Sequence, residues 1–186
     1  PDAADTRIPR YRERGRRSGR RMSDSKLALD LSGTWKHKKT TGETEQFFGD
    51  QGFSWVTRKL IGNLVLVSYT KTEVITMDAE TYQCDEAGSP QDSSHKQTIK
   101  LKIGSGEEIQ FIDANRKTVK LKADWNEKRD KLVFRTSNEE FPKVIYRYLL
   151  NENTMVEEQH CADEDGKPKA GSIIQHFEKV AAEGNN

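Results

Sequence analysis

His160 and Cys161 are the adjacent residues with the clearest potential for catalysis, since a histidine base can activate a thiol nucleophile. They lie in an alternating, strand-like segment, however, where neighbouring side chains point to opposite faces and cannot act together. The acidic run at 163–166 resembles a calcium loop but lacks the downstream glutamate that closes one. The four histidines stand on separate segments without metal-ligand spacing. We therefore predict no enzymatic activity, no metal site and no cofactor.

Arg147 is the charged residue whose position most suggests ligand binding. It alternates with Ile145 and Leu149, so the three side chains share one face of a predicted strand. If that face is inward, the guanidinium needs an acceptor, because an unpaired buried charge is far more costly than a paired one. An anionic group of a bound ligand would supply that acceptor, and Gln175 could add a neutral hydrogen-bond donor. Alternatively, Arg147 pairs with a nearby carboxylate or with ordered waters and touches a ligand only indirectly.

The segments that would position these residues alternate with period two and are separated by short turns, which is typical of antiparallel strands joined in chain order. Ten strands are predicted, at 34–41, 64–70, 73–80, 96–103, 107–112, 116–124, 131–137, 142–150, 153–161 and 171–180. Residues 44–62 lack this alternation, and their apolar residues recur at helical intervals around Gly49 and Gly52, which favours two short helices. The predicted fold is all-β: a ten-stranded antiparallel up-and-down barrel capped by a short helix-turn-helix. Such a barrel is too wide for its own side chains to fill.

Composition and charge narrow the protein class further. The 186 residues are 33% hydrophobic and 33% charged, with a net charge of +1. The run of aliphatic residues at 64–67 is far shorter than the roughly 20 residues that a membrane-spanning helix needs. Two cysteines, Cys84 and Cys161, are too few for a disulfide framework, which favours free thiols in a reducing compartment. We expect a cytoplasmic monomer, with the nucleus as a second location.

Residues 1–21 differ from the rest of the chain. They contain eight arginines and carry a net charge of +5, whereas the remainder carries −4. This segment is interpreted as a region upstream of a natural start at Met22, as a disordered basic tail, or as a nuclear or organellar address. Residues 22–186 are then expected to form a single β-barrel domain.

Several short motifs together resemble the intracellular lipid-binding protein family, which comprises the fatty-acid-binding and cellular retinoid-binding proteins. They are Leu-Ser-Gly-Thr-Trp-Lys at 31–36, Thr-Arg-Lys-Leu at 57–60, Asp-Ala-Asn-Arg-Lys-Thr at 113–118 and Phe-Glu-Lys-Val at 177–180. Each motif is weak alone, but their order and spacing match the family over residues 27–181. The resemblance implies a barrel that holds one lipid, with Arg147 at the position of a headgroup-binding arginine. Gln175 and Phe177 replace the arginine and tyrosine of the fatty-acid-binding pattern and resemble the retinol-binding branch.

From the residues and the resemblance together we expect a carrier of one long-chain fatty acid or similar acidic lipid, in transient contact with anionic membranes. The expected ligand-binding residues are Arg147, Gln175, Phe177, Tyr82, Ile145 and Leu149, with Tyr82 gating an entry portal at the turn between the third and fourth strands. Longer loops are expected at 83–97 and 162–171. The alternatives are a retinoid or other hydrophobic ligand, a secreted eight-stranded lipocalin-like binder, and nucleic-acid binding through the arginine-rich tail, which is not favoured.

Overall fold

The computed structural model describes residues 29–65, 71–88, 94, 96–112, 117–137 and 140–181, with the backbone alone at 62–65. The proposed tail at 1–21, the start of the predicted domain and residues 113–116 of the motif at 113–118 lie outside the described residues. Within them, ten strands and two helices follow one another along the chain. The strands are β1 (Gly33–Thr41), β2 (Thr72–Met77), β3 (Thr81–Ala87), β4 (Lys96–Lys102), β5 (Ile109–Ile112), β6 (Thr118–Trp125), β7 (Leu132–Ser137), β8 (Lys143–Asn151), β9 (Thr154–Cys161) and β10 (Ile173–Val180).

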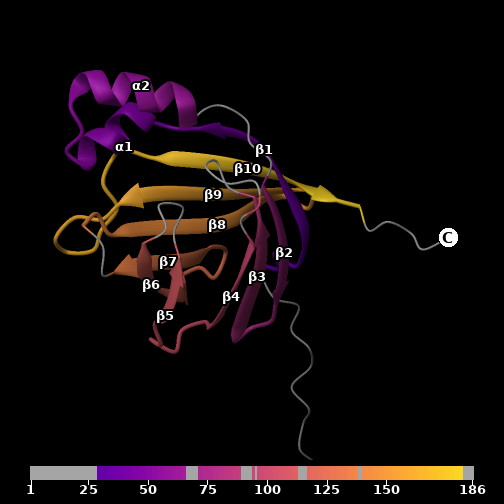
Figure 1. Ribbon diagram of the computed structural model, residues 1–186. Helices are drawn as coiled ribbons and strands as arrows, with labels where there is room; N and C mark the ends of the chain where they lie inside the picture. The colour runs from indigo at the N-terminus through magenta and orange to yellow at the C-terminus, as the bar shows by residue number, and fades with distance from the viewer. Residues whose placement is uncertain are drawn as a thin grey trace, which may run out of the picture.

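All ten strands belong to one antiparallel sheet in the order β4-β3-β2-β1-β10-β9-β8-β7-β6-β5. Every neighbour in this order is a neighbour in the chain except for the β1–β10 pair, so the connections run up and down. The sheet curls until its two ends approach, and Ile103 beyond β4 forms an isolated bridge with Ala123 of β6. The ten strands therefore form a nearly closed barrel, as the sequence predicted (Figure 1).

Alternation along the strands places the core inside the barrel. On β6, Val119, Leu121 and Ala123 are buried, while the lysines between them are more exposed. Trp35 is completely buried, and its indole N–H donates to the carbonyl oxygen of Leu31 at 2.8 Å. Phe177 is also completely buried, which stabilises the fold by about 1.5–3 kcal/mol for a side chain of this type.

The helical pair comprises α1 (Thr44–Asp50) and α2 (Trp55–Val65), between β1 and β2, and lies beside β1 and β10 (Figure 1). Phe47 and Phe48 of α1 are buried in a second apolar cluster that includes Cys161 and Ile173 from the barrel wall. At Gly171 the chain passes so close to α1 that a Cβ there would lie 2.2 Å from the backbone nitrogen of Phe47. These contacts fix α1 against the barrel.

Two of the predicted segments, the strand at 64–70 and the loop at 83–97, differ from the structure. The predicted strand at 64–70 begins within α2, which continues to Val65, and its remainder at 66–70 lies outside the described residues. Conversely, the predicted loop at 83–97 contains most of β3. Strand β3 alternates in burial, with Tyr82 and Cys84 buried, but its other residues are mostly polar, so its hydrophobic pattern is weak. The predicted connection at 162–171 lies between β9 and β10, as expected.

Candidate functional site

Arg147 projects into the barrel. It lies in the middle of β8, is 8% exposed, and shares its face with Ile145 and Leu149, which pack against the main core. Its guanidinium contacts Glu73 on β2, although β9, β10 and β1 separate those two strands in the sheet. A contact between strands so far apart in the sheet must cross the interior. Arg147 therefore links opposite walls of the barrel.

The guanidinium of Arg147 is held along its edges by two carboxylates. Its Nη1 donates to Oε2 of Glu73 at 2.8 Å, and its Nη2 donates to Oε1 of the same carboxylate at 2.9 Å. Its Nε donates to Oε2 of Glu157 on β9 at 2.6 Å, and Nη2 forms an ion pair with that oxygen. Nη1 also donates to the hydroxyl oxygen of Tyr82. The sequence-based alternative, in which Arg147 pairs with protein carboxylates, is therefore what the structure contains.

A lysine extends these contacts. Lys71, just before β2, places its Nζ 2.7 Å from Oε1 of Glu73 and 2.7 Å from Oε1 of Glu86 on β3. Glu86 in turn accepts a hydrogen bond from Gln97 at 2.9 Å. We call Lys71, Glu73, Glu86, Arg147 and Glu157 the interior charge network. Its formal charges are two positive and three negative.

The pKa shifts in the network favour ionised groups. Burial alone would raise the pKa of Glu157, but the positive charges of Arg147 and Lys71, with hydrogen bonds from Gln159 and Arg147, hold this pKa at about 2. Burial opposes the charge on Arg147, yet Glu157 and Glu73 raise its pKa above the ordinary value. Burial also opposes ionisation of Glu86, whose pKa is nevertheless lowered, mainly by Lys71. Mutual attraction thus overcomes the cost of burial in this network.

Two polar side chains of β3, those of Tyr82 and Cys84, border the network, and burial disfavours the ionised form of both. Burial raises the pKa of the Tyr82 hydroxyl well above its ordinary value. Burial, reinforced by the negative charge of Glu73, raises the pKa of the Cys84 thiol to about 12. A thiol with such a pKa contains almost no thiolate at neutral pH and is a poor nucleophile.

The predicted site residues are distributed as follows. Arg147 and Tyr82 are in direct contact, while Ile145 and Leu149 line the same interior region. On β10, Gln175 and Phe177 are both buried, and the ring centroid of Phe177 lies 5.7 Å from the Nζ of Lys71. The predicted portal position of Tyr82 is wrong. Tyr82 is 1% exposed and is the second residue of β3, near the opposite end of that strand from its connection to β4.

Sequence reasoning missed Glu73, Glu157, Lys71 and Glu86, which complete the site. A signal was present for the first two. Glu73 shares a strand face with Ile75, and Glu157 shares one with Met155, so each carboxylate lies two residues from a buried apolar side chain on the same face. Such a residue is expected to be paired inside a barrel. Its partner across the interior cannot be read from local alternation.

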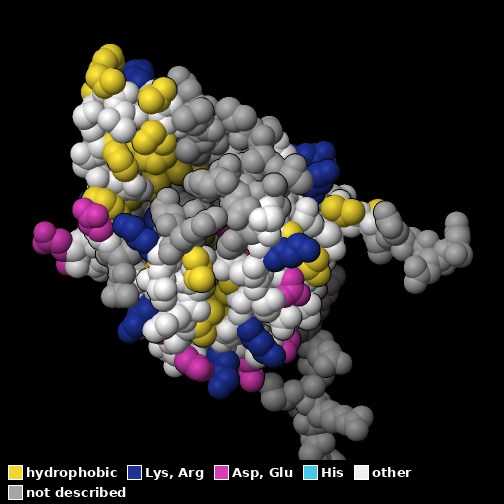
Figure 2. All heavy atoms as spheres, viewed as in Figure 1, with side chains coloured by type: hydrophobic (Ala, Val, Ile, Leu, Met, Phe, Trp, Pro, Cys, Tyr) yellow, Lys and Arg dark blue, Asp and Glu magenta, His cyan; other side chains and the backbone are white. Residues whose placement is uncertain are grey.

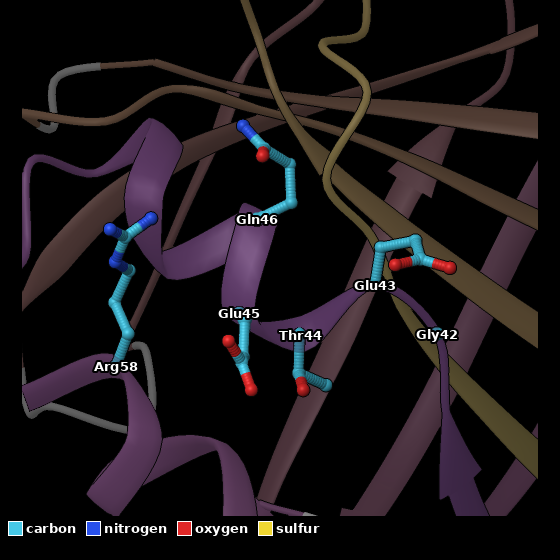
Figure 3. A pocket seen from close by; sticks show the side chains of 6 residues that line it. All are labelled: Gly42, Glu43, Thr44, Glu45, Gln46 and Arg58. Carbon is cyan, nitrogen blue, oxygen red and sulfur yellow. The ribbon is translucent and has the colours of Figure 1, made fainter. Parts of the chain in front are cut away.

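A separate pocket lies on the surface between the two helices. It is lined by Gly42, Glu43, Thr44, Glu45, Gln46 and Arg58, which come from the end of β1, from α1 and from α2 (Figure 3). These side chains are polar, with two carboxylates and one guanidinium. The pocket is therefore less suited to an apolar ligand than the barrel interior.

The described residues lack the patterns of two other kinds of site. No helix among them is long and apolar enough to cross a bilayer. The same residues contain no group of three or more histidine, cysteine, aspartate or glutamate side chains placed to hold a metal ion. The thiols of Cys84 and Cys161 are free and buried.

Solved structures that share this fold include a fatty acid transporter and a fatty-acid-binding protein, which agrees with the fold that the sequence resemblance predicted. One similar structure is the fluorescent protein UnaG, with a TM-score of 0.57 and 16% identity, covering 81% of this chain and 97% of UnaG. A second is the REP1-NXSQ fatty acid transporter, with a TM-score of 0.55 and 14% identity, covering 81% of this chain and 98% of the transporter. A third is fatty-acid-binding protein 1 of Echinococcus granulosus, with a TM-score of 0.55 and 18% identity, covering 81% and 98%. No family model and no curated protein matches the sequence.

Proposed function

We propose that this protein is a non-enzymatic carrier that holds one hydrophobic small molecule inside its barrel. The observation that carries the proposal is the polar network that meets across the interior from β2, β3, β8 and β9. A solidly apolar core would not need these groups, whereas a barrel around an amphipathic ligand uses a few polar groups to orient it. The cytoplasm remains the expected location.

The polar end of the ligand has two candidate chemistries. A fatty acid is supported by the interior position of Arg147 and by fold neighbours described as a fatty acid transporter and a fatty-acid-binding protein. A retinoid or another uncharged hydrophobic ligand is supported by the carboxylates that already hold Arg147. In either case the apolar chain supplies most of the affinity, since burying each methylene contributes about 0.8 kcal/mol before ordering costs.

Native mass spectrometry of the purified protein tests the carrier function directly. We expect a complex with one ligand per chain, and extraction followed by mass spectrometry should identify the bound lipid. Reloading the delipidated protein with a long-chain lipid should restore the mass shift. A protein that neither retains nor takes up any hydrophobic molecule would contradict the proposal.

We also propose that the helical pair touches anionic membranes when the ligand is exchanged. Trp55, Val56 and Leu60 of α2 are each at least 64% exposed, and Phe53 just before α2 is 39% exposed. Figure 2 shows hydrophobic side chains gathered over this part of the molecule. Lys59 lies on the same helix and could meet lipid phosphates. Apolar side chains beside basic ones are typical of surfaces that bind membrane interfaces.

Cosedimentation with anionic vesicles tests this contact. The double variant Trp55→Ser, Leu60→Ser should lose most of the vesicle binding, because it removes the two largest exposed apolar side chains of α2. The matched control is Leu150→Ser, Val180→Ser, which removes exposed apolar side chains from the barrel. Equal binding by the two double variants would exclude α2 as the membrane contact.

A further inference from the structure

Within the interior charge network, every N–H group of Arg147 already has a protein acceptor, so no donor of Arg147 is left for a ligand. A guanidinium carries five N–H groups. Those of Arg147 are directed at Glu73 through Nη1 and Nη2, at Glu157 through Nε and Nη2, and at Tyr82 through Nη1. A ligand carboxylate could bind this side chain only by displacing a protein carboxylate that is itself buried. Arg147 is therefore not a vacant anion receptor.

The balance of charge around the network also opposes an anion. Glu73, Glu86 and Glu157 carry three negative charges against the two positive charges of Lys71 and Arg147. Glu73 is 0% exposed and Glu157 is 4% exposed, so water does little to screen the excess negative charge. A ligand carboxylate would add a fourth negative charge to the same region.

The same groups can still accept hydrogen bonds. A carboxylate offers about four acceptor positions. Within the described part of the chain, Glu86 accepts from Lys71 and from Gln97, and each of these two contacts uses a different oxygen. Oε1 of Glu157 accepts from Gln159 at 2.6 Å, while its other oxygen faces Arg147. The region around the network is thus rich in acceptors and suits a group that donates.

We propose that the barrel discriminates against carboxylates and takes a lipid whose polar end donates hydrogen bonds and bears no negative charge. Long-chain alcohols, primary amides and amines share this chemistry. The inference rests on the proposed carrier function and specifies its ligand class. Glu157 is the specificity-determining residue, because it contributes the negative charge that occupies the Nε side of Arg147.

A matched series of saturated ligands tests this selectivity in the full-length protein. Palmitate, hexadecanol, hexadecanamide and hexadecylamine each displace a bound uncharged fluorescent dye at neutral pH. We expect palmitate to bind at least about tenfold more weakly than hexadecanol and hexadecanamide, a typical cost for burying an unmatched charge. If hexadecylamine binds more tightly than hexadecanol, the excess negative charge of the network contributes to the affinity. If the two bind equally, the preference depends on hydrogen-bond donation alone. Palmitate binding as tightly as the alcohol would overturn the inference and leave the carrier function standing.

The variant Glu157→Gln tests the assigned residue. It removes one negative charge and releases one edge of Arg147, so palmitate should gain about tenfold relative to hexadecanol. The control Glu158→Gln makes the same change in overall charge at the next residue of β9, whose side chain contacts Tyr148 and His160 instead. It should leave the ratio unchanged. An unchanged ratio in a folded Glu157→Gln protein would overturn the assignment. If Glu157→Gln does not fold, the ligand series in the wild-type protein tests the inference alone. Failure of the wild-type protein to bind any of the four ligands would overturn the carrier function as well.

Discussion

At the scale of single residues, Arg147 shows how a buried charge is accommodated in this barrel. Its neighbours Ile145 and Leu149 make its inward orientation predictable from alternation alone. Its partner Glu73 was not predictable, because that contact depends on how the sheet curls and not on any local pattern. The rule that a buried guanidinium must be paired predicts that Arg147 has an anionic partner, but the sequence could not show whether that partner is a ligand or a protein carboxylate.

Replacement of Arg147 should therefore affect stability strongly. Arg147→Met leaves Glu73 and Glu157 buried without their main cationic partner, so the free energy of unfolding should fall by about 3–5 kcal/mol. Denaturant unfolding followed by circular dichroism measures the change. Arg135→Met on β7 is the matched control, because Arg135 is exposed and its replacement should change stability little. Equal effects of the two replacements would mean that the network contributes nothing to folding.

Acid should weaken the same network. The pKa of Glu157, which burial raises but Arg147 lowers more, is about 2 in the folded protein and ordinarily 4.5. Ionised Glu157 thus contributes stability that is complete above about pH 4.5 and is lost as the pH falls towards 2. We expect the free energy of unfolding to fall less steeply over this range in Glu157→Gln than in the wild type. Identical slopes in urea titrations at several pH values would argue against this role.

At the scale of secondary-structure elements, predictability depended on how apolar the inward face is. Strand β6 was predicted because Val119, Leu121 and Ala123 alternate with lysines. Strand β3 was missed because its inward residues include Tyr82 and Glu86, whose polar groups serve the network. A barrel with a charged interior weakens the period-two signal where the candidate site is built. The failure of the pattern at β3 is therefore explained by the interior charge network.

The contact between α1 and the barrel should be sensitive to one methyl group. Gly171→Ala places a Cβ against the backbone of Phe47, which cannot move without displacing α1. We expect a loss of about 1–3 kcal/mol in the free energy of unfolding, as is typical of overpacking. Thermal unfolding measures it, with Ala170→Ser at the adjacent exposed position as the control. Full stability of Gly171→Ala would mean that α1 is not held as closely as the structure indicates.

At the scale of the whole molecule, closure of ten strands into one barrel separates an interior from an exterior along every strand. Adjacent residues of β8 illustrate this division. Leu149 packs against the interior core, whereas Leu150 is 58% exposed on the outside. The two leucines have the same chemistry and neighbouring positions, so they report separately on the space inside the barrel and on its outer surface.

Filling the interior should therefore compete with the ligand. Leu149→Trp adds an indole to the space that a lipid would occupy and should weaken binding of one lipid per chain by at least about tenfold, whereas Leu150→Trp should leave it unchanged. Displacement of an uncharged fluorescent dye measures both affinities, and thermal unfolding verifies that each variant is folded. If Leu149→Trp is unstable, Leu149→Phe provides a milder test with the same expected direction. Equal affinities in the two folded variants would mean that the ligand binds outside the barrel. Binding inside the barrel would then be contradicted, and the surface of the helical pair would become the candidate site.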